Sequence, residues 1–249
     1  MSKSILTRRG FLIGAAAVAG GIALPQLRHV QLPPSYGGLL GLGDTLSYAA
    51  HRVLLRHQPL AREFGPEMIS KNFPAINTVN PEDEEYQRLL RGGFVDFRLP
   101  ITGLVERPLS LSVDDLRSFP ARTQITQHNC EQGWSAIAEW TGVSLSRVLE
   151  HAGMKPSARY VLFRCADGWW DSIDMLDALH PQTLLAYGMN GQAMPIQHGA
   201  PVRLRVERQL GYKSLKYVTS VEVTESLHAI EDGTGAMVTS FGYSWYAGI

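Results

Sequence analysis

The sequence has 249 residues and 23 basic and 23 acidic side chains, so its formal net charge is zero. A neutral balance lacks the electrostatic footprint of a nucleic-acid-binding protein, so no nucleic acid partner is expected. Hydrophobic residues make up 45% of the chain and charged residues 18%, which predicts a globular protein with a core. Two cysteines, Cys130 and Cys165, are too few for a disulfide scaffold, although one bridge between them stays open.

Residues 1–24 are interpreted as an export signal. Arg8 and Arg9 precede an apolar run of small residues that is too short for a comfortable transmembrane helix. The adjacent arginines resemble the twin-arginine type of signal, which predicts a periplasmic protein. No clear cleavage site follows, so a retained N-terminal membrane anchor is the alternative. Because the twin-arginine route moves folded proteins, this signal also favours a protein that binds a cofactor.

Residues 25–63 are interpreted as a linker rich in Pro, Gly and Leu, followed by an amphipathic helix. Asp44 is expected to cap this helix at its start. Apolar residues follow at helical spacing, at Leu46, Ala49, Ala50, Val53 and Leu54. His51 and His57 belong to the same segment and are expected on the helix surface.

From residue 94 onward the pattern is a mixture of strands and short helices. Alternating or continuous apolar runs predict strands at 95–101, 122–126, 159–165, 201–207 and 215–224. Ser112 and Asp115 resemble a capping box, and residues 143–153 have helical periodicity that ends at a glycine. Asn190-Gly191 is a hairpin signal. Because strands and helices do not alternate regularly, the fold class is predicted to be α+β.

Cys130 stands in the segment TQHNCEQGWS, and three interpretations compete for it. In the first, it is a buried structural residue or one half of a bridge to Cys165. In the second, it is the nucleophile of a thiol hydrolase, for which His180 or His198 would be the base. In the third, it is a metal ligand. One thiolate cannot complete a zinc site, but it can complete a metal whose other sulfurs come from a bound cofactor.

Residues 180–223 favour the metal interpretation. They place His198, Arg203, Lys213 and Lys216 close in sequence to tight glycine turns. Cations and the backbone N–H groups of glycine turns are what a phosphate-bearing cofactor requires. Arginines on a strand are more often simply solvated, so this pattern alone does not decide the function.

Three parts of the sequence together carry a resemblance: Cys130 with Trp134, the stretch ALHPQTLLAYGMNGQAMPIQHGAPVRL, and GYKSLKYV. In this order they resemble the molybdopterin-binding domain of the sulfite oxidase family. The likeness is strongest to its compact bacterial periplasmic branch, which includes a methionine-sulfoxide reductase catalytic subunit. It covers residues 64–226. It implies the mixed-sheet α+β sulfite-oxidase fold and an enzyme with one molybdenum-molybdopterin cofactor per chain.

The resemblance also implies roles for individual residues. The family's cysteine ligand to molybdenum corresponds to Cys130, and its arginine at the phosphate end of the cofactor corresponds to Arg203. A planar guanidinium suits phosphate better than an ammonium does. Cys165 stands where a relative has threonine and is expected in the cofactor pocket. The other residues expected to contact the cofactor are Asn72, Phe73, His198, Ser214, Leu215 and Lys216.

The implied reaction is oxygen-atom transfer, or coupled electron and proton transfer, on a sulfite-like, sulfoxide or N-oxide substrate, small or protein-bound. A membrane haem protein or a cytochrome is expected as the electron-transfer partner. Residues 227–249 are interpreted as a C-terminal tail, too short for the immunoglobulin-like dimerisation domain of animal-type relatives. The expected unit is therefore a monomer without that domain.

The segment CADGWWDSI has two interpretations of equal weight. Asp167, Trp169 and Trp170 line the entrance to the active site, or they form a turn with two packed aromatic rings. Two other classes of function also stay open for the whole chain. A thiol hydrolase would need a cysteine of lowered pKa paired with a histidine. A non-catalytic periplasmic binding module would tolerate the loss of Cys130.

Overall fold

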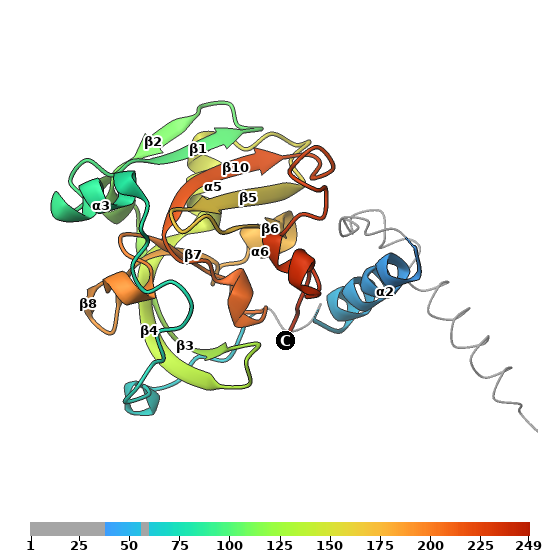
Figure 1. Ribbon diagram of the computed structural model, residues 1–249, viewed down its shortest axis with the longest axis horizontal. Coiled ribbons are helices and arrows are strands. Elements are labelled where there is room, and N and C mark those ends of the chain that lie inside the picture. The colour runs from blue at the N-terminus through green and yellow to red at the C-terminus, as the bar shows by residue number, and fades with distance from the viewer. Residues whose placement is uncertain (1–37, 56–59) are drawn as a thin grey trace, which may run out of the picture. The chain divides into compact units, whose positions relative to one another are not determined.

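The computed structural model describes residues 38–55 and 60–249, so the predicted export signal and its arginines lie outside the described residues. The described chain contains two β-sheets of five strands each (Figure 1). The first sheet has the order β2 (Leu109–Leu111), β1 (Leu99–Gly103), β10 (Val218–Thr224), β5 (Tyr160–Cys165) and β6 (Trp170–Asp174). Within it β1 and β10 are parallel, whereas the other pairs are antiparallel.

The second sheet is antiparallel. Its order is β3 (Ala121–Asn129), β4 (Ser135–Ser144), β7 (Leu184–Met189) and β8 (Gln192–Ala193). The fifth strand, β9 (Arg203–Arg205), pairs with the first half of β7, while β8 pairs with its last two residues. The predicted α+β class with mixed sheets is therefore confirmed.

Short helices connect the strands. The α-helices are α2 (Gly38–Leu54), α3 (Glu84–Arg91), α4 (Val113–Ser118), α5 (Leu145–Ala152) and α6 (Met175–Ala178). The 3-10 turns are η3 (Pro66–Met68), η4 (Ile196–His198), η5 (Gly211–Lys213) and η6 (Met237–Phe241). Within residues 38–55 and 60–249, no helix has the length and apolar character needed to cross a membrane.

Local sequence signals that depend on a few neighbouring residues are confirmed. Ser112 and Asp115 form the predicted capping box at the start of α4. Helix α5 ends at Gly153, which has the left-handed conformation that glycine adopts without a Cβ penalty. Asn190 and Gly191 both have positive φ and connect β7 to β8, as their hairpin signal predicts.

Two boundary predictions are wrong. Helix α2 begins at Gly38, so Asp44 lies inside it and does not cap it. The predicted strand at 95–101 begins only at Leu99, because Phe94 has a positive φ of 60° and Val95 is 76% exposed in a turn. The helix thus begins before the predicted start, whereas the strand begins after it.

The hydrophobic core joins the two sheets. One cluster of buried side chains includes Val143 and Leu185 of the second sheet with Phe163 and Val221 of the first. The buried face of α5, which includes Leu149, packs against the same cluster.

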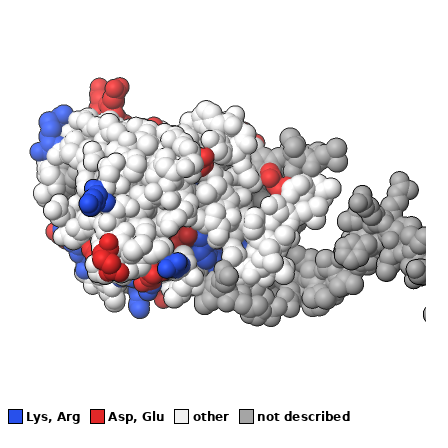
Figure 2. Space-filling view, turned by 90° about the horizontal axis from the view of Figure 1, so that it is seen from below, with Lys and Arg blue, Asp and Glu red and all other residues white. Residues whose placement is uncertain are grey.

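On the face shown in Figure 2, acidic and basic side chains are scattered among uncharged ones without a large patch of one sign.

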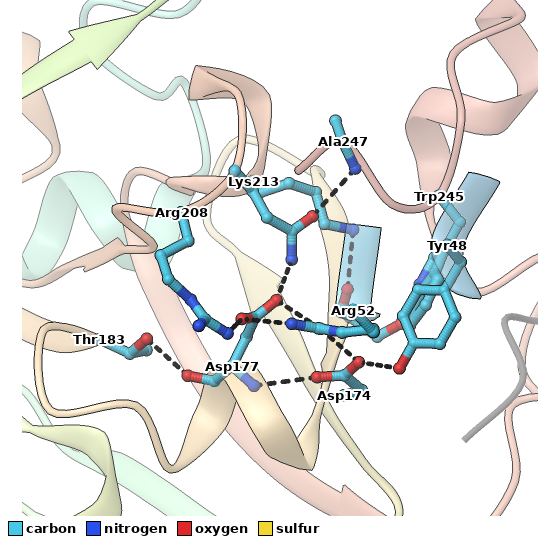
Figure 3. A network of polar contacts seen from close by, with 11 residues as sticks. Tyr48, Arg52, Asp174, Asp177, Thr183, Arg208, Lys213, Trp245 and Ala247 are labelled. Carbon is cyan, nitrogen blue, oxygen red and sulfur yellow. Dashed lines mark hydrogen bonds and ion pairs between the residues drawn. The ribbon is translucent and has the colours of Figure 1, made fainter. Parts of the chain in front are cut away.

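A buried polar network fastens α2 to the rest of the described chain (Figure 3). The guanidinium group of Arg52 pairs with Asp177 at 2.8 Å and also with Asp174, which accepts a hydrogen bond from the Tyr48 hydroxyl. Arg208 contacts the same Asp177 carboxylate at 2.8 Å. The side of α2 that packs is therefore polar and aromatic, whereas Leu46, Val53 and Leu54 of the predicted apolar face are more than half exposed.

Candidate active site

A cavity of about 350 Å³ collects most of the predicted site residues. Its walls come from segments far apart in the sequence, including the end of β3, the turn between β5 and β6, and η4. The loop that follows η5 and the C-terminal turn η6 complete them. The predicted residues that line it are Phe73, Cys130, His198, Arg203, Ser214, Leu215 and Lys216, with Asp167 and Trp169 from the expected entrance.

Cys130 occupies the tight turn that joins β3 to β4. Its backbone N–H donates to the Trp134 carbonyl at 2.9 Å, and its own carbonyl accepts from the Gly133 N–H at 3.1 Å. Gly133 has φ 89°, a conformation that favours glycine. The sulfur accepts from the Gln132 N–H at 3.5 Å and lies 3.5 Å from a Glu131 carboxylate oxygen. Burial raises the pKa of this thiol to about 11.

Aromatic rings surround Phe73 on one side of the cavity. Its ring centroid lies 5.4–5.9 Å from those of His128, Trp134, Trp140 and His198. His128 is the last inward-facing residue of β3 before Cys130, and Trp140 is fully buried on β4. The cluster thus brings together the segment before the domain's first strand and the hairpin that carries the cysteine.

Arg203 enters the cavity from β9 and is only 3% exposed. Its Nη1 and Nη2 atoms donate to the carbonyl oxygens of His198 and Ser214, each at 2.9 Å. Its Nε is buried and has no hydrogen-bond partner among the described residues. Burial and the neighbouring charge of Arg205 lower the pKa of Arg203 to about 9. Arg203 is therefore not a solvated strand residue.

Lys216 and His198 add to the cationic side of the cavity. Lys216 donates to the backbone oxygen of Ile76 at 2.8 Å and to that of Thr78. Burial and the charge of Arg203 lower the pKa of Lys216 to about 8. Burial, with Arg203 and Lys216, lowers the pKa of His198 to about 4, so its imidazole is neutral near pH 7.

Close packing holds this cationic side in place. A Cβ atom at Gly199, which has φ 112°, would lie 3.0 Å from the Lys216 Cα and 3.1 Å from the Arg203 Cβ. A Cβ at Gly211 would lie 2.3 Å from the His128 Nε2. Contacts under 3.0 Å force a shift, so the Gly211 turn approaches His128 closely because it has no side chain.

An anionic group matches this arrangement. Within the described part of the chain, no carboxylate forms an ion pair with Arg203 or Lys216. A buried cation without a counter-charge is costly, and the lowered pKa values of both side chains express that cost. A phosphate would supply the missing charge and an acceptor for the Arg203 Nε. The residues therefore fit a phosphate-bearing cofactor.

The entrance is aromatic and partly acidic. Trp169 stacks on Phe241 with centroids 6.0 Å apart and an interplanar angle of 6°. Asp167 lines the cavity and accepts from the Trp169 N–H at 3.3 Å, and burial raises its pKa. Of the three residues expected at the entrance, Trp170 lies on β6 and is not among the lining residues of this cavity.

Two predicted cofactor residues lie apart from the cavity lining. Asn72 is exposed next to Phe73. Cys165 is 7% exposed at the end of β5, packs in the hydrophobic core, and has a pKa raised well above its ordinary value by burial. Both cysteines are free, so the alternative of a bridge between Cys130 and Cys165 is wrong for this structure.

Several lining residues were not predicted from the sequence. His128 could have been found, because it lies two residues before Cys130 on a strand whose alternate side chains share a face. Tyr212 and Gly211 belong to the GYKSLK block but received no role. Val238, Phe241 and Tyr243 come from the segment interpreted as a tail and carry no local signal.

The thiol hydrolase alternative finds little support in this geometry. A nucleophilic cysteine needs a lowered pKa, whereas that of Cys130 is raised. His180 is buried outside the cavity lining, where its Nδ1 accepts from the Gln182 N–H at 3.2 Å. His198 lines the cavity, but burial and the positive charges of Arg203 and Lys216 disfavour the imidazolium that a general base must form. Within residues 38–55 and 60–249, no cluster of three or more His, Cys, Asp or Glu side chains could hold a metal ion.

Comparison with known proteins also favours a cofactor-binding enzyme over a thiol hydrolase. Residues 91–229 match the family model described as the oxidoreductase molybdopterin binding domain. The putative protein-methionine-sulfoxide reductase subunit YedZ1 of Azospira oryzae is 38% identical over 247 residues, which cover 99% of this chain and 88% of that one.

Two further relatives are similar over about half of the chain. The protein-methionine-sulfoxide reductase catalytic subunit MsrP of Campylobacter jejuni is 34% identical over 147 residues, covering 52% of this chain and 50% of that protein. The crystal structure of the sulfane dehydrogenase SoxCD from Paracoccus pantotrophus superposes with a TM-score of 0.50 at 30% identity. That match covers 53% of this chain and 39% of the other. The chain belongs to the oxidoreductase molybdopterin-binding domain family, as its resemblance to sulfite oxidases implied, and is a molybdenum-cofactor-dependent oxidoreductase.

Proposed function

We propose that this chain is the catalytic unit of a periplasmic sulfoxide reductase, with Cys130 as the protein ligand to molybdenum. The observation that carries the proposal is that the Cys130 sulfur and the cations Arg203 and Lys216 line one cavity. To bind this cofactor, a protein must supply a thiolate ligand for the metal and a group that binds the phosphate. The printed names of two relatives, both methionine-sulfoxide reductase subunits, support a sulfoxide as substrate.

Different residues would bind different parts of the cofactor. The guanidinium of Arg203 and the ammonium of Lys216 would bind its phosphate end, with the free Arg203 Nε as one donor. Neutral His198 and the ring of Phe73 would face the pterin, and Cys130 would ligate the metal. When bound, the cofactor supplies the metal centre at which an oxygen atom and two electrons are exchanged.

Reduction of a sulfoxide to a thioether and water consumes two electrons and two protons. The carboxyl group of Asp167 could hold one of these protons, because it lines the cavity, is partly buried, and has a pKa that burial raises. The electrons come from a separate protein, and a membrane haem protein or a cytochrome fits that role. The word "subunit" in the names of both reductase relatives supports a partner for this otherwise monomeric unit.

The function is tested with protein purified from a molybdenum-replete host. We expect about one molybdenum and one pterin per chain, and reduction of methionine sulfoxide by a dye-reduced enzyme without oxidation of sulfite at a comparable rate. Cys130→Ala should abolish turnover while the pterin stays bound, because the phosphate contacts lie elsewhere. Near-normal turnover in that variant, or folded protein without metal and pterin, contradicts the proposal.

The periplasmic location is tested with the double variant Arg8→Lys/Arg9→Lys. We expect this variant to stay in the cytoplasm, because the adjacent arginines are the recognised feature of the signal.

A further inference from the structure

The mouth of the cavity carries an aromatic surface that the cofactor contacts do not use. It consists of Trp169 from the turn between β5 and β6, and Phe241 and Tyr243 from the C-terminal segment, and we call it the aromatic rim. Phe241 is 60% exposed and Tyr243 is 43% exposed. Large apolar side chains grouped at a cavity mouth are typical of a binding surface.

We propose that the aromatic rim binds the apolar substituents of a neutral sulfoxide and makes the site selective for a methionine-sulfoxide side chain over a small oxyanion. This inference rests on the proposed function and names the residues that set its substrate preference.

The rim is a built structure rather than a loose end of the chain. The rings of Trp169 and Phe241 have nearly parallel planes with centroids 6.0 Å apart, so each ring limits the movement of the other. Tyr243 packs on Tyr212 with centroids 5.5 Å apart, and the Tyr212 hydroxyl donates to the Ser244 carbonyl at 2.7 Å. Because each exposed ring has a fixed partner, the rim offers a preformed surface with little entropy left to lose on binding.

The same strand that follows Trp169 anchors the C-terminal segment. Asp171 forms a bridge with Ala236, just before η6. The Trp245 indole N–H donates to the Ser172 hydroxyl at 2.9 Å, just after Tyr243. Both ends of the segment that carries Phe241 and Tyr243 are thus tied to β6, which holds them beside Trp169.

Aromatic rings suit the sulfur side chain that this site would receive. The methyl and methylene groups of methionine sulfoxide are apolar, and the thioether product is a soft, polarisable group that contacts ring edges favourably. The rim can hold these substituents while the S–O group points toward the metal ligand. Sulfite has no apolar substituent, so it would gain nothing from these rings.

Charge at the mouth also favours a neutral substrate over a small anion. The carboxylate of Glu131 lines the cavity beside Cys130, 3.5 Å from its sulfur. The cations Arg203 and Lys216 already donate to backbone oxygens and are assigned to the cofactor's phosphate. A small anion approaching the metal would therefore meet negative charge, whereas a neutral sulfoxide would not.

Two of the three rim residues lie outside the part of the chain that matches the family model. The family model ends at residue 229, and Phe241 and Tyr243 lie beyond it. Cys130 and Arg203 lie within it. The matched part thus contains the proposed metal ligand, the phosphate-binding cations and Trp169, and the segment after residue 229 adds Phe241 and Tyr243 to the rim.

The test uses molybdenum-loaded holoenzyme and three probes: the neutral amide N-acetylmethionine sulfoxide methylamide, dimethyl sulfoxide, and sulfite. We expect Phe241→Ala to raise the KM for the amide about tenfold while kcat stays within about twofold, because binding energy is lost equally in ground and transition states. Dimethyl sulfoxide, which is too small to span the rim, should be affected less. Phe241→Leu, which keeps apolar area but not the ring, should fall between wild type and Phe241→Ala.

Leu176→Ala is the matched control, because Leu176 is 46% exposed on α6 and does not line the cavity. A second readout needs no turnover: the thioether N-acetylmethionine methylamide should quench tryptophan fluorescence of the wild type, and more weakly that of Phe241→Ala. Equal KM values and equal quenching in wild type, Phe241→Ala and Phe241→Leu overturn the inference alone. A wild type that reduces no sulfoxide overturns the proposed function, and this inference with it.

Discussion

Two buried regions of this chain hold positive charge in opposite ways. In the network of Figure 3, the Asp177 carboxylate is shared by Arg52, Arg208 and the Gln209 amide at 2.6–3.0 Å. In the cavity, Arg203 donates only to backbone carbonyl oxygens. In the first region the buried arginines form ion pairs with carboxylates, whereas in the second Arg203 and Lys216 form no ion pair with a carboxylate of the described residues.

The pKa directions express the same contrast. Burial alone would lower the pKa of Arg52, but the charges of Asp174 and Asp177 raise it above the ordinary value. Burial alone would raise the pKa of Asp177, but Arg52 and Arg208 lower it to about 2. For Arg203, burial and the charge of Arg205 outweigh the opposing charge of Glu207, and its pKa falls to about 9. One region therefore stabilises the fold, and the other is arranged for a ligand.

The largest expected effect comes from breaking the network. Asp177→Asn leaves Arg208 and part of the Arg52 guanidinium without a counter-charge in a buried site. Removing one partner of a buried ion pair typically costs about 3–5 kcal/mol, so the free energy of unfolding should fall by that amount. Chemical denaturation of the cofactor-free protein measures it. Asp114→Asn is the control, because Asp114 pairs with Arg117 on the exposed surface and should leave the midpoint unchanged.

If the network is only a solvated ion cluster, Asp177→Asn and Asp114→Asn will unfold at the same denaturant concentration. The contact of Lys213 with Asp171 links this region to the loop that enters the cavity, at 2.5 Å. Because Asp177 itself does not line the cavity, cofactor content in Asp177→Asn should fall only as far as the fraction of folded protein does.

Removing Arg203 should produce the reverse pattern. Hydrogen bonds to charged groups contribute about 1.5–3 kcal/mol, so Arg203→Ala should lower cofactor affinity by roughly tenfold to a hundredfold. Stability of the cofactor-free protein should change less, because the variant also removes an uncompensated buried charge. Arg203→Lys should be partly defective, because the charge survives without the planar fork. Molybdenum and pterin content, beside a melting curve of each variant, measure both effects.

Arg205 is the internal control for that experiment. It stands two residues away on the same strand, but its guanidinium pairs with Glu207 at 2.8 Å. Arg205→Ala should therefore lower stability more than Arg203→Ala does. Full cofactor occupancy in both Arg203 variants would show that Arg203 belongs with the structural cations, and the contrast between the two regions would disappear.

The sequence predicted the residues on the cationic side of the cavity better than those at its entrance, and the reason is locality. His198, Arg203 and Lys216 stand within 19 residues of one another in motif blocks, and their glycine turns are visible as letters. Phe241 and Tyr243 reach the cavity only because Trp245 and Ala236 are held by β6. No periodicity in residues 227–249 encodes that contact, so the sequence alone predicts only a tail.

The same limit applies to the fold. The α+β class followed from strand patterns that each need only a few neighbours. The buried network could not be predicted, because Tyr48 and Arg52 meet Asp174 and Asp177 across more than 120 residues. Apolar periodicity instead favoured the side of α2 that stays exposed. Burial of a charged face becomes favourable only when its partners arrive from elsewhere in the chain.

The smallest of these effects is a pH dependence in the cavity. Burial, Arg203 and Lys216 lower the pKa of His198 to about 4, below its ordinary value of about 6.5. The unfolded chain therefore binds a proton at a higher pH than the folded chain does. His198 costs no stability above pH 6.5, and its cost grows as the pH falls from 6.5 toward 4.

Between pH 7 and pH 5 this cost should reach about 1–2 kcal/mol in the cofactor-free protein, at about 1.4 kcal/mol for each pKa unit. His198→Gln removes the titration, so the difference between wild type and variant isolates it from the other acids and bases. Denaturation of both proteins at the two pH values measures that difference. In the loaded enzyme a phosphate beside Arg203 and Lys216 should raise the pKa of His198 and shrink the effect. An equal pH dependence with and without cofactor would mean that no anion sits among these cations, and the distinction between the two regions would fail at its central point.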